Sequence, residues 1–370
     1  MIKRILSDTL LEKFGKGKAI LLIGPRQVGK TTLIYSLLEN KEFLFLNGDD
    51  PTVRTLLANV NTQQLNNIIA NNKIIFIDEA QRIENIGLTL KLITDQFKDV
   101  QLIVSGSSAF ELNNLINEPL TGRKWEYHLY PISWEEFENE FGYLKSEQEL
   151  ELRLRFGMYP DVINNKGEEY EVLNELVTSY LYKDILAFGG IRKPEILEKL
   201  LKALALQVGS EVNYNELSRL IGVSKNTINS YIDLLAKGYV IFKLPSFSKN
   251  LRTEIRTNQK IYFYDNGVRN AIIGSFNPLE LRTDVGLLWE NFLISERIKK
   301  NGYYKLKVNH FFWRTKQQQE IDFIEKTNDN LKAFEFKWKS STKIKIPKTF
   351  TSTYNTDVKI IDRSNFREFV

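Results

Sequence analysis

The glycine-rich segment 24–31 constrains this chain most, because its sequence GPRQVGKT fits the phosphate-binding pattern G-x-x-x-x-G-K-S/T. It follows the apolar run 19–23, typical of a buried parallel strand, and precedes residues 32–38, whose apolar side chains have helical spacing. The glycines allow successive N–H groups to point at phosphates, and the dipole of the following helix favours anions. The pattern predicts a nucleoside triphosphate site at Gly24, Pro25, Arg26, Gln27, Val28, Gly29, Lys30, Thr31 and Thr32.

A second motif predicts hydrolysis of the bound nucleotide. The apolar run 74–77 is followed by Asp78 and Glu79, a Walker B pattern, at a distance from Lys30 that leaves room for further helices and strands of an α/β domain. We expect Lys30 to reach the β- and γ-phosphates. Thr31 and Asp78 are expected to hold Mg2+, and Glu79 to orient and polarise the attacking water.

Two more positions are candidates for contact with the γ-phosphate. The strand candidate 101–104 ends in a serine cluster, of which Ser105 is expected beside the nucleotide because ligands bind at the carboxyl edge of a parallel sheet. Arg123 precedes another strand candidate, 125–129, and an arginine there would stabilise charge on the γ-phosphate. The sequence leaves open whether Arg123 acts in its own subunit or in a neighbouring one.

A helix-turn-helix pattern follows a helical region that runs from about residue 134 to 206. Ser224 is expected to cap its second helix, whose outward residues near the start are Lys225, Asn226, Thr227 and Asn229. Two strand candidates, 239–242 and 261–264, then enclose a basic segment with Lys243, Lys249, Arg252, Arg256 and Lys260. This reads as a winged helix with a basic wing, which would contact either DNA phosphates or a protein partner.

The C-terminal region carries a possible metal site. Glu290 lies on an amphipathic helix, Asp322 on a strand, and Glu335 with Lys337 on one face of a further strand. Asp322 and Glu335, with Glu290, would coordinate Mg2+ that activates water, and Lys337 would position the water or offset phosphate charge. Alternatively these are ordinary polar residues on the solvent face of a sheet.

Together these motifs make the chain resemble AAA-type ATPases of the archaeal-ATPase group, which carry a winged helix and a C-terminal domain of unknown function related to PD-(D/E)xK nucleases. The resemblance rests on segments 24–31, 78–81, 105–107, 120–123, 182–185, 313–315, 320–323 and 335–337. It implies an α/β fold with a P-loop AAA-type parallel sheet, a helical lid, a winged helix-turn-helix and a restriction-endonuclease-like α/β domain. The expected ranges are 1–130, 131–198, 199–265 and 266–370.

Composition limits the alternatives without choosing among them. The 370 residues contain no cysteine, which excludes disulfides and thiolate sites, and the net charge of +5 permits nucleic-acid binding without arguing for it. No apolar segment reaches the length of a membrane span, so we expect a cytoplasmic protein. From the motifs we expect an ATPase that uses ATP and Mg2+, binds DNA and can form homo-oligomers. The other readings are a regulatory ATP switch whose C-terminal domain only binds protein partners, and a ring-forming motor.

Overall fold

The computed structural model describes residues 2–107, 119–181, 193–248, 259–328, 330–340 and 345–370. The chain divides into two compact units, one formed by residues 1–132 with 237–239 and the other by 133–236 with 240–370. The first unit ends within two residues of the expected ATPase boundary at residue 130. The three other expected domains fall in the second unit apart from residues 131–132 and 237–239, and all the expected boundaries stay predictions.

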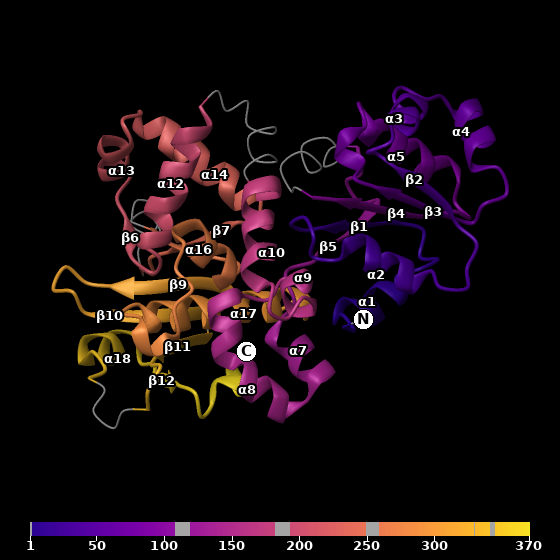
Figure 1. Ribbon diagram of the computed structural model, residues 1–370. Helices are drawn as coiled ribbons and strands as arrows, with labels where there is room; N and C mark the ends of the chain where they lie inside the picture. Colours follow the sequence, from indigo (N-terminus) through magenta and orange to yellow (C-terminus); the bar gives the residue numbers. More distant parts are fainter. Residues whose placement is uncertain (1, 108–118, 182–192, 249–258, 329, 341–344) are drawn as a thin grey trace. The chain divides into compact units, whose positions relative to one another are not determined.

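The first unit is built on a parallel sheet with strand order β2-β3-β4-β1-β5 (Figure 1). The interior strand β1 is apolar and buried at every position, as expected for a parallel strand covered on both faces. The edge strands β2 and β5 are only partly buried. The strands are β1 (Ala19–Ile23), β2 (Leu44–Asn47), β3 (Ile74–Asp78), β4 (Gln101–Gly106) and β5 (Lys124–His128).

Two helices of the first unit begin at local capping signals. The Asp50 side chain accepts a hydrogen bond from Thr52 N at the start of α3, and Asn61 and Gln64 form a capping box at the start of α4. The helices are α1 (Leu6–Leu11), α2 (Lys30–Leu37), α3 (Pro51–Leu57), α4 (Thr62–Ile69) and α5 (Ile86–Gln96), with a 3-10 turn η1 (Ala80–Arg82). Since α2 follows β1 directly, the phosphate loop lies at the carboxyl edge of the sheet.

The second unit opens with the expected helical region. Ser133 and Glu136 form a capping box at its first helix, and Gly157, with φ of 75°, ends α8 where the sequence predicted a break. The elements are α7 (Trp134–Phe141), α8 (Tyr143–Phe156), α9 (Pro160–Asn164), α10 (Glu169–Glu175), a π-helical turn η2 (Leu176–Leu181) and α12 (Pro194–Leu206).

Next come two short helices and a small antiparallel sheet of order β6-β8-β7. The elements are β6 (Glu211–Val212), α13 (Tyr214–Ile221), α14 (Lys225–Lys237), β7 (Ile241–Pro245), β8 (Gln259–Phe263) and α16 (Asn266–Ile273). Strand β7 begins two residues after the start of the expected strand 239–242, and β8 begins two residues before the start of the expected strand 261–264.

The last part of the second unit is a four-stranded sheet of order β12-β11-β10-β9, against which the long helix α17 packs (Figure 1). Its elements are η3 (Leu279–Leu281), α17 (Val285–Tyr303), β9 (Asn309–Arg314), β10 (Glu320–Thr327), β11 (Asn330–Phe336), α18 (Lys348–Tyr354), β12 (Val358–Ile361) and α19 (Phe366–Phe369). The expected strand ending at Trp338 stops at Phe336, although Lys337 N still donates to Ile361 O at 3.0 Å.

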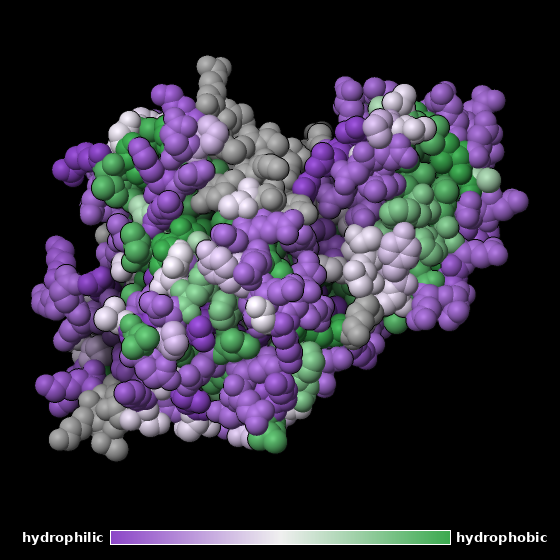
Figure 2. Space-filling model, viewed as in Figure 1, coloured by the Kyte–Doolittle hydropathy of each residue, from purple (hydrophilic) through white to green (hydrophobic). Residues whose placement is uncertain are grey.

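Several sequence motifs fall outside the described residues: Ser108, the segment 182–185, Gly189 with Gly190, and the wing residues Lys249, Arg252 and Arg256. None of the described helices combines the length and apolarity needed to cross a membrane. Hydrophilic residues cover most of the face visible in Figure 2.

Candidate functional site

The phosphate loop connects the end of β1 to the start of α2, and its first glycine has no room for a side chain. A Cβ on Gly24 would lie 2.0 Å from the carbonyl oxygen of Leu129, the residue after β5. The last glycine, Gly29, is the N-cap of α2 and has φ of 90°, a conformation that only glycine adopts readily. Both positions therefore need glycine for reasons that the fold makes explicit.

Lys30 lies almost completely buried within this loop, with 4% of its surface exposed. Its Nζ donates to the carbonyl oxygens of Gly24 at 3.0 Å and Pro25 at 2.8 Å. The ammonium group is thus held at the centre of the loop that the sequence assigned to phosphates. Binding a nucleotide would exchange these carbonyl contacts for phosphate oxygens.

The carboxylate of Asp78 accepts hydrogen bonds from hydroxyl groups of two other segments. One of its carboxylate oxygens, Oδ2, accepts a hydrogen bond from Thr31 Oγ1 at 2.7 Å, and Oδ1 accepts one from Ser105 Oγ. The structure thus brings together three predicted residues from α2, β3 and β4. A threonine hydroxyl beside an aspartate carboxylate is an all-oxygen set of the kind that Mg2+ prefers, so these residues fit the expected ion.

Glu79 directly follows this carboxylate and has a left-handed backbone, with φ of 48° and ψ of 42°. Its Oε2 accepts a hydrogen bond from Gln81 Nε2 at 2.5 Å. Gln81 also donates to Ser107 Oγ at 2.9 Å. The sequence predicted the position of Glu79 but assigned no role to Gln81.

A second unpredicted contact comes from Arg4, which is 6% exposed. Its guanidinium donates to Val28 O at 2.7 Å and to Tyr130 O at 2.6 Å. It therefore ties the phosphate loop to the chain after β5. Nothing local in the sequence around Arg4 indicated this contact, because its partners are 24 and 126 positions away.

Arg123 does not lie beside the phosphate loop of its own chain. It precedes β5, and its carbonyl accepts a hydrogen bond from the N–H of Ala19, the first residue of β1, at 2.9 Å. Since the phosphate loop follows the other end of β1, Arg123 lies at the opposite edge of the parallel sheet, about 13 Å of strand away. Its Nε is 2.6 Å from Asp95 Oδ1, and this hydrogen bond keeps the pKa of Asp95 below its usual value. Within its own chain Arg123 therefore lies away from the phosphate loop, and its action in its own subunit or in a neighbouring one stays a prediction.

The predicted C-terminal acidic residues surround a buried lysine. Lys260, from β8, is 2% exposed, and its Nζ lies 3.3 Å from Glu290 Oε1 and pairs with Glu320 Oε1. Tyr262 donates to Glu290 Oε1 at 2.5 Å. Burial disfavours the charged form of Lys260, but Glu290, Glu320 and Asp322 outweigh burial and raise its pKa.

The remaining members of this constellation also have partners. Asp322 Oδ2 accepts from Phe336 N at 2.8 Å, and burial, with the nearby charges of Glu290 and Glu335, raises the pKa of Asp322 well above its usual value. Lys337 Nζ is 2.7 Å from Glu335 Oε1. Burial lowers the pKa of Lys337, yet this contact and the other carboxylates outweigh burial, so that its pKa is raised.

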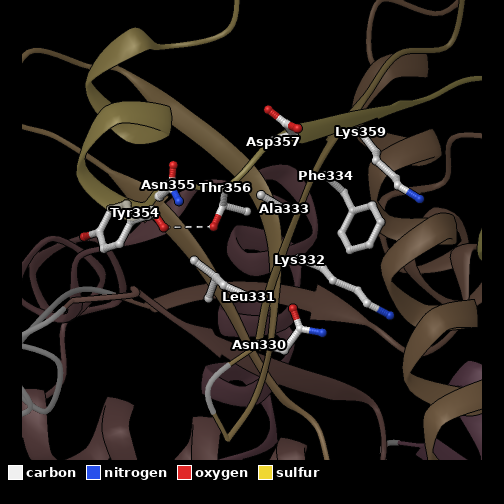
Figure 3. A pocket seen from close by; sticks show the side chains of 10 residues that line it. All are labelled: Asn330, Leu331, Lys332, Ala333, Phe334, Tyr354, Asn355, Thr356, Asp357 and Lys359. Atoms are coloured by element: carbon white, nitrogen blue, oxygen red, sulfur yellow. Dashed lines mark hydrogen bonds between the residues drawn. The ribbon is translucent and has the colours of Figure 1, made fainter.

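The expected metal site at Glu290, Asp322 and Glu335 is not assembled in this arrangement. Within the described ranges no three histidine, cysteine, aspartate or glutamate side chains are grouped closely enough to hold a metal ion. Two of these carboxylates are instead paired with ammonium groups, Glu290 with Lys260 and Glu335 with Lys337. A shallow cavity of about 520 Å3 opens nearby between β11 and the turn before β12, but none of the four predicted residues lines it (Figure 3).

The helix-turn-helix pattern is present as α13 and α14, joined by a turn at Gly222. Ser224 Oγ accepts from Thr227 N at 3.1 Å, which confirms the predicted cap. Lys225, Asn226 and Asn229 are exposed, while Thr227 is only partly so. Two residues expected on the basic wing are engaged elsewhere, since Lys243 pairs with Asp233 and Lys260 is buried among carboxylates.

Comparison with known families supports the assignment of the first unit. Residues 16–138 match a family described as an AAA domain, whereas 147–279 and 285–366 match domains of unknown function (DUF8612 and DUF4143). A Walker-type ATPase of Pyrococcus abyssi has a similar fold, with a TM-score of 0.52 and 15% identity, over 74% of this chain and 96% of that one. The chain therefore carries a P-loop ATPase domain of the AAA type.

Similar curated proteins carry the description 'uncharacterized protein'. One from Mycobacterium tuberculosis is 26% identical over 347 residues, which cover 92% of this chain and 75% of the relative. Another, from Haemophilus influenzae, is 24% identical over 332 residues, covering 85% of this chain and 78% of the relative. These relatives align with most of the chain, and their names give no activity.

Proposed function

We propose that this chain hydrolyses ATP with Mg2+ at the loop 24–31 and the carboxyl ends of β3 and β4. The observation that carries the proposal is the convergence of Thr31 and Ser105 on the carboxylate of Asp78, next to the buried Lys30. Lys30 would bind the β- and γ-phosphates, and Thr31 and Asp78 would hold Mg2+, which supplies charge neutralisation when bound. Glu79 would take up the proton of the attacking water as that oxygen bonds to the γ-phosphorus and the bond to the bridging oxygen of ADP breaks.

The test compares wild-type protein with Lys30→Ala and Glu79→Gln. Nucleotide affinity is measured with a fluorescent ATP analogue, and turnover by phosphate release. Lys30→Ala should lose nucleotide binding, while Glu79→Gln should keep binding and lose hydrolysis. Normal turnover in either variant overturns the proposal.

We further propose that α12, α13, α14 and the sheet β6-β8-β7 form a winged helix that contacts DNA. The order of these elements along the chain supports the winged-helix assignment, and the exposed Lys225, Asn226 and Asn229 at the start of α14 offer groups for bases and phosphates. The net charge of +5 is compatible with this use. The competing reading is a winged helix that binds a protein.

Binding of a labelled duplex at two salt concentrations distinguishes these readings. Lys225→Ala, and separately Arg252→Ala with Arg256→Ala, should weaken binding and flatten its salt dependence. The reason is that a protein with fewer phosphate contacts releases fewer counterions from the DNA when it binds. Lys91→Ala, which changes an exposed lysine on α5 outside the proposed winged helix, is the matched control. Unchanged affinity in both test proteins rejects DNA contact by this surface.

For the C-terminal sheet we propose a PD-(D/E)xK-like fold that serves as an interaction platform in an ATP-controlled switch. Pairing of Glu290 with Lys260 and of Glu335 with Lys337 favours this reading over metal-dependent cleavage. Wild-type protein should then leave single- and double-stranded DNA intact with Mg2+ or Mn2+, with or without ATP. Cleavage that is lost in both Asp322→Ala and Lys337→Ala would instead establish a nuclease.

For Arg123 we propose a role in the nucleotide site of a second copy of the chain. The placement of Arg123 at the sheet edge away from its own phosphate loop supports an action across subunits of a homo-oligomer. Mixing Arg123→Ala with wild-type protein tests this: loss of ATPase activity beyond simple dilution supports it, and proportional loss rejects it.

A further inference from the structure

Gln81 lies in the 3-10 turn that follows the acidic end of β3, and only 7% of its surface is exposed. The turn begins at Glu79, whose left-handed backbone reverses the chain directly after the strand. Arg82 N then donates to Glu79 O at 3.0 Å and closes the turn. This local geometry brings the side chain of residue 81 back against the side chain of residue 79.

The amide nitrogen of Gln81 is the group that faces Glu79. Gln81 Nε2 donates to Glu79 Oε2 at 2.5 Å and to Ser107 Oγ at 2.9 Å. An ionised carboxylate can only accept hydrogen bonds, so the contact with Glu79 fixes which end of the amide is nitrogen. Both amide protons are thereby used, and Glu79 is tied to the segment that follows β4.

The other end of the same amide is buried without a donor. Gln81 Oε1 is enclosed, and no hydrogen-bond donor among the described residues reaches it. Leaving a buried acceptor unsatisfied costs about 1–3 kcal/mol, so such an atom calls for an explanation. A small donor that is not part of the protein, next to the carboxylate of Glu79, would satisfy it.

We propose that Gln81 is a positioning residue for ATP hydrolysis, which holds the Glu79 carboxylate through Nε2 and accepts a hydrogen bond from the attacking water through Oε1. The water then has two fixed acceptors, one that takes its proton and one that orients it. This inference rests on the proposed ATPase function and adds to it a residue outside the phosphate-loop and Walker B patterns. Ser107 supports the same amide from the side of β4.

The experiment measures steady-state ATP hydrolysis and nucleotide affinity for Gln81→Ala, Gln81→Glu, Ser107→Ala, Glu79→Gln and the double variant Gln81→Ala with Glu79→Gln. Gln81→Ala should lower kcat roughly 10- to 100-fold and leave the affinity for ATP within about twofold, as expected for a group that acts on the water rather than on the nucleotide. Gln81→Glu keeps the acceptor but repels Glu79, and should lose comparable activity. Ser107→Ala should lose less, because one amide contact remains.

A positioning role through Glu79 has a signature that simple destabilisation lacks. In single-turnover measurements, which resolve the residual hydrolysis of Glu79→Gln, the double variant should be no slower than Glu79→Gln alone, because Gln81 then has no general base to position. Gln63→Ala, an exposed glutamine on α4, is the matched control and should behave like wild type. Full kcat in Gln81→Ala, an equal loss in kcat and affinity, or additive losses in the double variant each overturn the inference.

The test separates failure of this inference from failure of the proposed function. If wild-type protein does not hydrolyse ATP, or if Glu79→Gln hydrolyses it normally, the ATPase assignment itself fails. If Glu79→Gln is inactive and Gln81→Ala is fully active, only the role of Gln81 fails.

Discussion

Replacing Lys260 by methionine should strongly destabilise the second unit. Lys260 is 2% exposed and its ammonium lies between Glu290, 12% exposed, and Glu320, 25% exposed. Methionine fills a similar volume but leaves both carboxylates without their shared counter-charge. Removing one partner of a buried ion pair typically costs about 3–5 kcal/mol, because the remaining charge stays buried.

The expected cost lies at the low end of that range. Glu320 is partly solvated and keeps a second cation, since Arg314 Nε lies 3.3 Å from its Oε2. We therefore expect a loss of about 3 kcal/mol, almost all from Glu290 and the nearby Asp322. For a unit of this size that corresponds to a fall in Tm of about 6–12 °C.

Thermal and urea unfolding of Lys260→Met would measure this loss, with the exposed Lys316→Met in the turn before β10 as control. Adding Glu290→Gln and Glu320→Gln to Lys260→Met should recover most of the stability, because no uncompensated charge then remains. A Lys260→Met protein within about 0.5 kcal/mol of wild type, the usual range for surface changes, would refute this reasoning. So would a triple variant that is no more stable than Lys260→Met.

Three further predictions concern single residues. Since the folded-state pKa of Asp322 is raised, the contribution of this carboxyl to stability should fall as pH rises from about 4 toward that pKa, and Asp322→Asn should gain on wild type in urea unfolding as pH rises over that interval; a constant difference would contradict this. Arg4→Ala should weaken ATP binding about tenfold in a fluorescence titration by releasing Val28 O, whereas the exposed neighbour Lys3→Ala should not; equal affinities would dismiss the contact. Gly24→Ala should cost roughly 1–3 kcal/mol in urea unfolding, because its Cβ meets Leu129 O, and an unchanged midpoint would argue against that clash.

The phosphate-binding half of the site was predictable because its chemistry is local in the sequence. Gly24, Lys30 and Thr31 lie within eight positions, and Asp78 follows a strand whose apolar run is unmistakable. Parallel strands bring their carboxyl ends to one edge, which is why Ser105, after β4, reaches Asp78 as expected. The contact between Gln81 and Glu79 was harder to predict from the sequence, because a left-handed residue in a short turn leaves no periodic pattern.

The same rule of parallel strands explains the position of Arg123 relative to the phosphate loop. A residue just before a strand lies at the amino edge, and a residue just after a strand lies at the carboxyl edge. Arg123 precedes β5 whereas the phosphate loop follows β1, so the two lie at opposite edges. The strand positions were predicted well enough to reach this conclusion from the sequence.

The C-terminal constellation shows what residue spacing cannot reveal. Alternation along β10 and β11 correctly groups acidic residues, but it is silent on a lysine that arrives from β8 of another sheet. Lys260 was expected on a basic wing because it lies among other basic residues in the sequence. Its burial beside Glu290 depends on tertiary packing.

The two acidic centres of the chain therefore differ in the cations that accompany them. At Asp78 the carboxylate accepts hydrogen bonds from hydroxyl and backbone amide groups, an arrangement suited to a divalent ion brought with ATP. At Glu290 and Glu335 the compensating charge is already part of the chain, as Lys260 and Lys337. A metal ion there would have to displace an ammonium group that its surroundings hold firmly charged. Electrostatics thus supports the proposal of metal-dependent ATP hydrolysis in the first unit and the proposal of a binding role in the second.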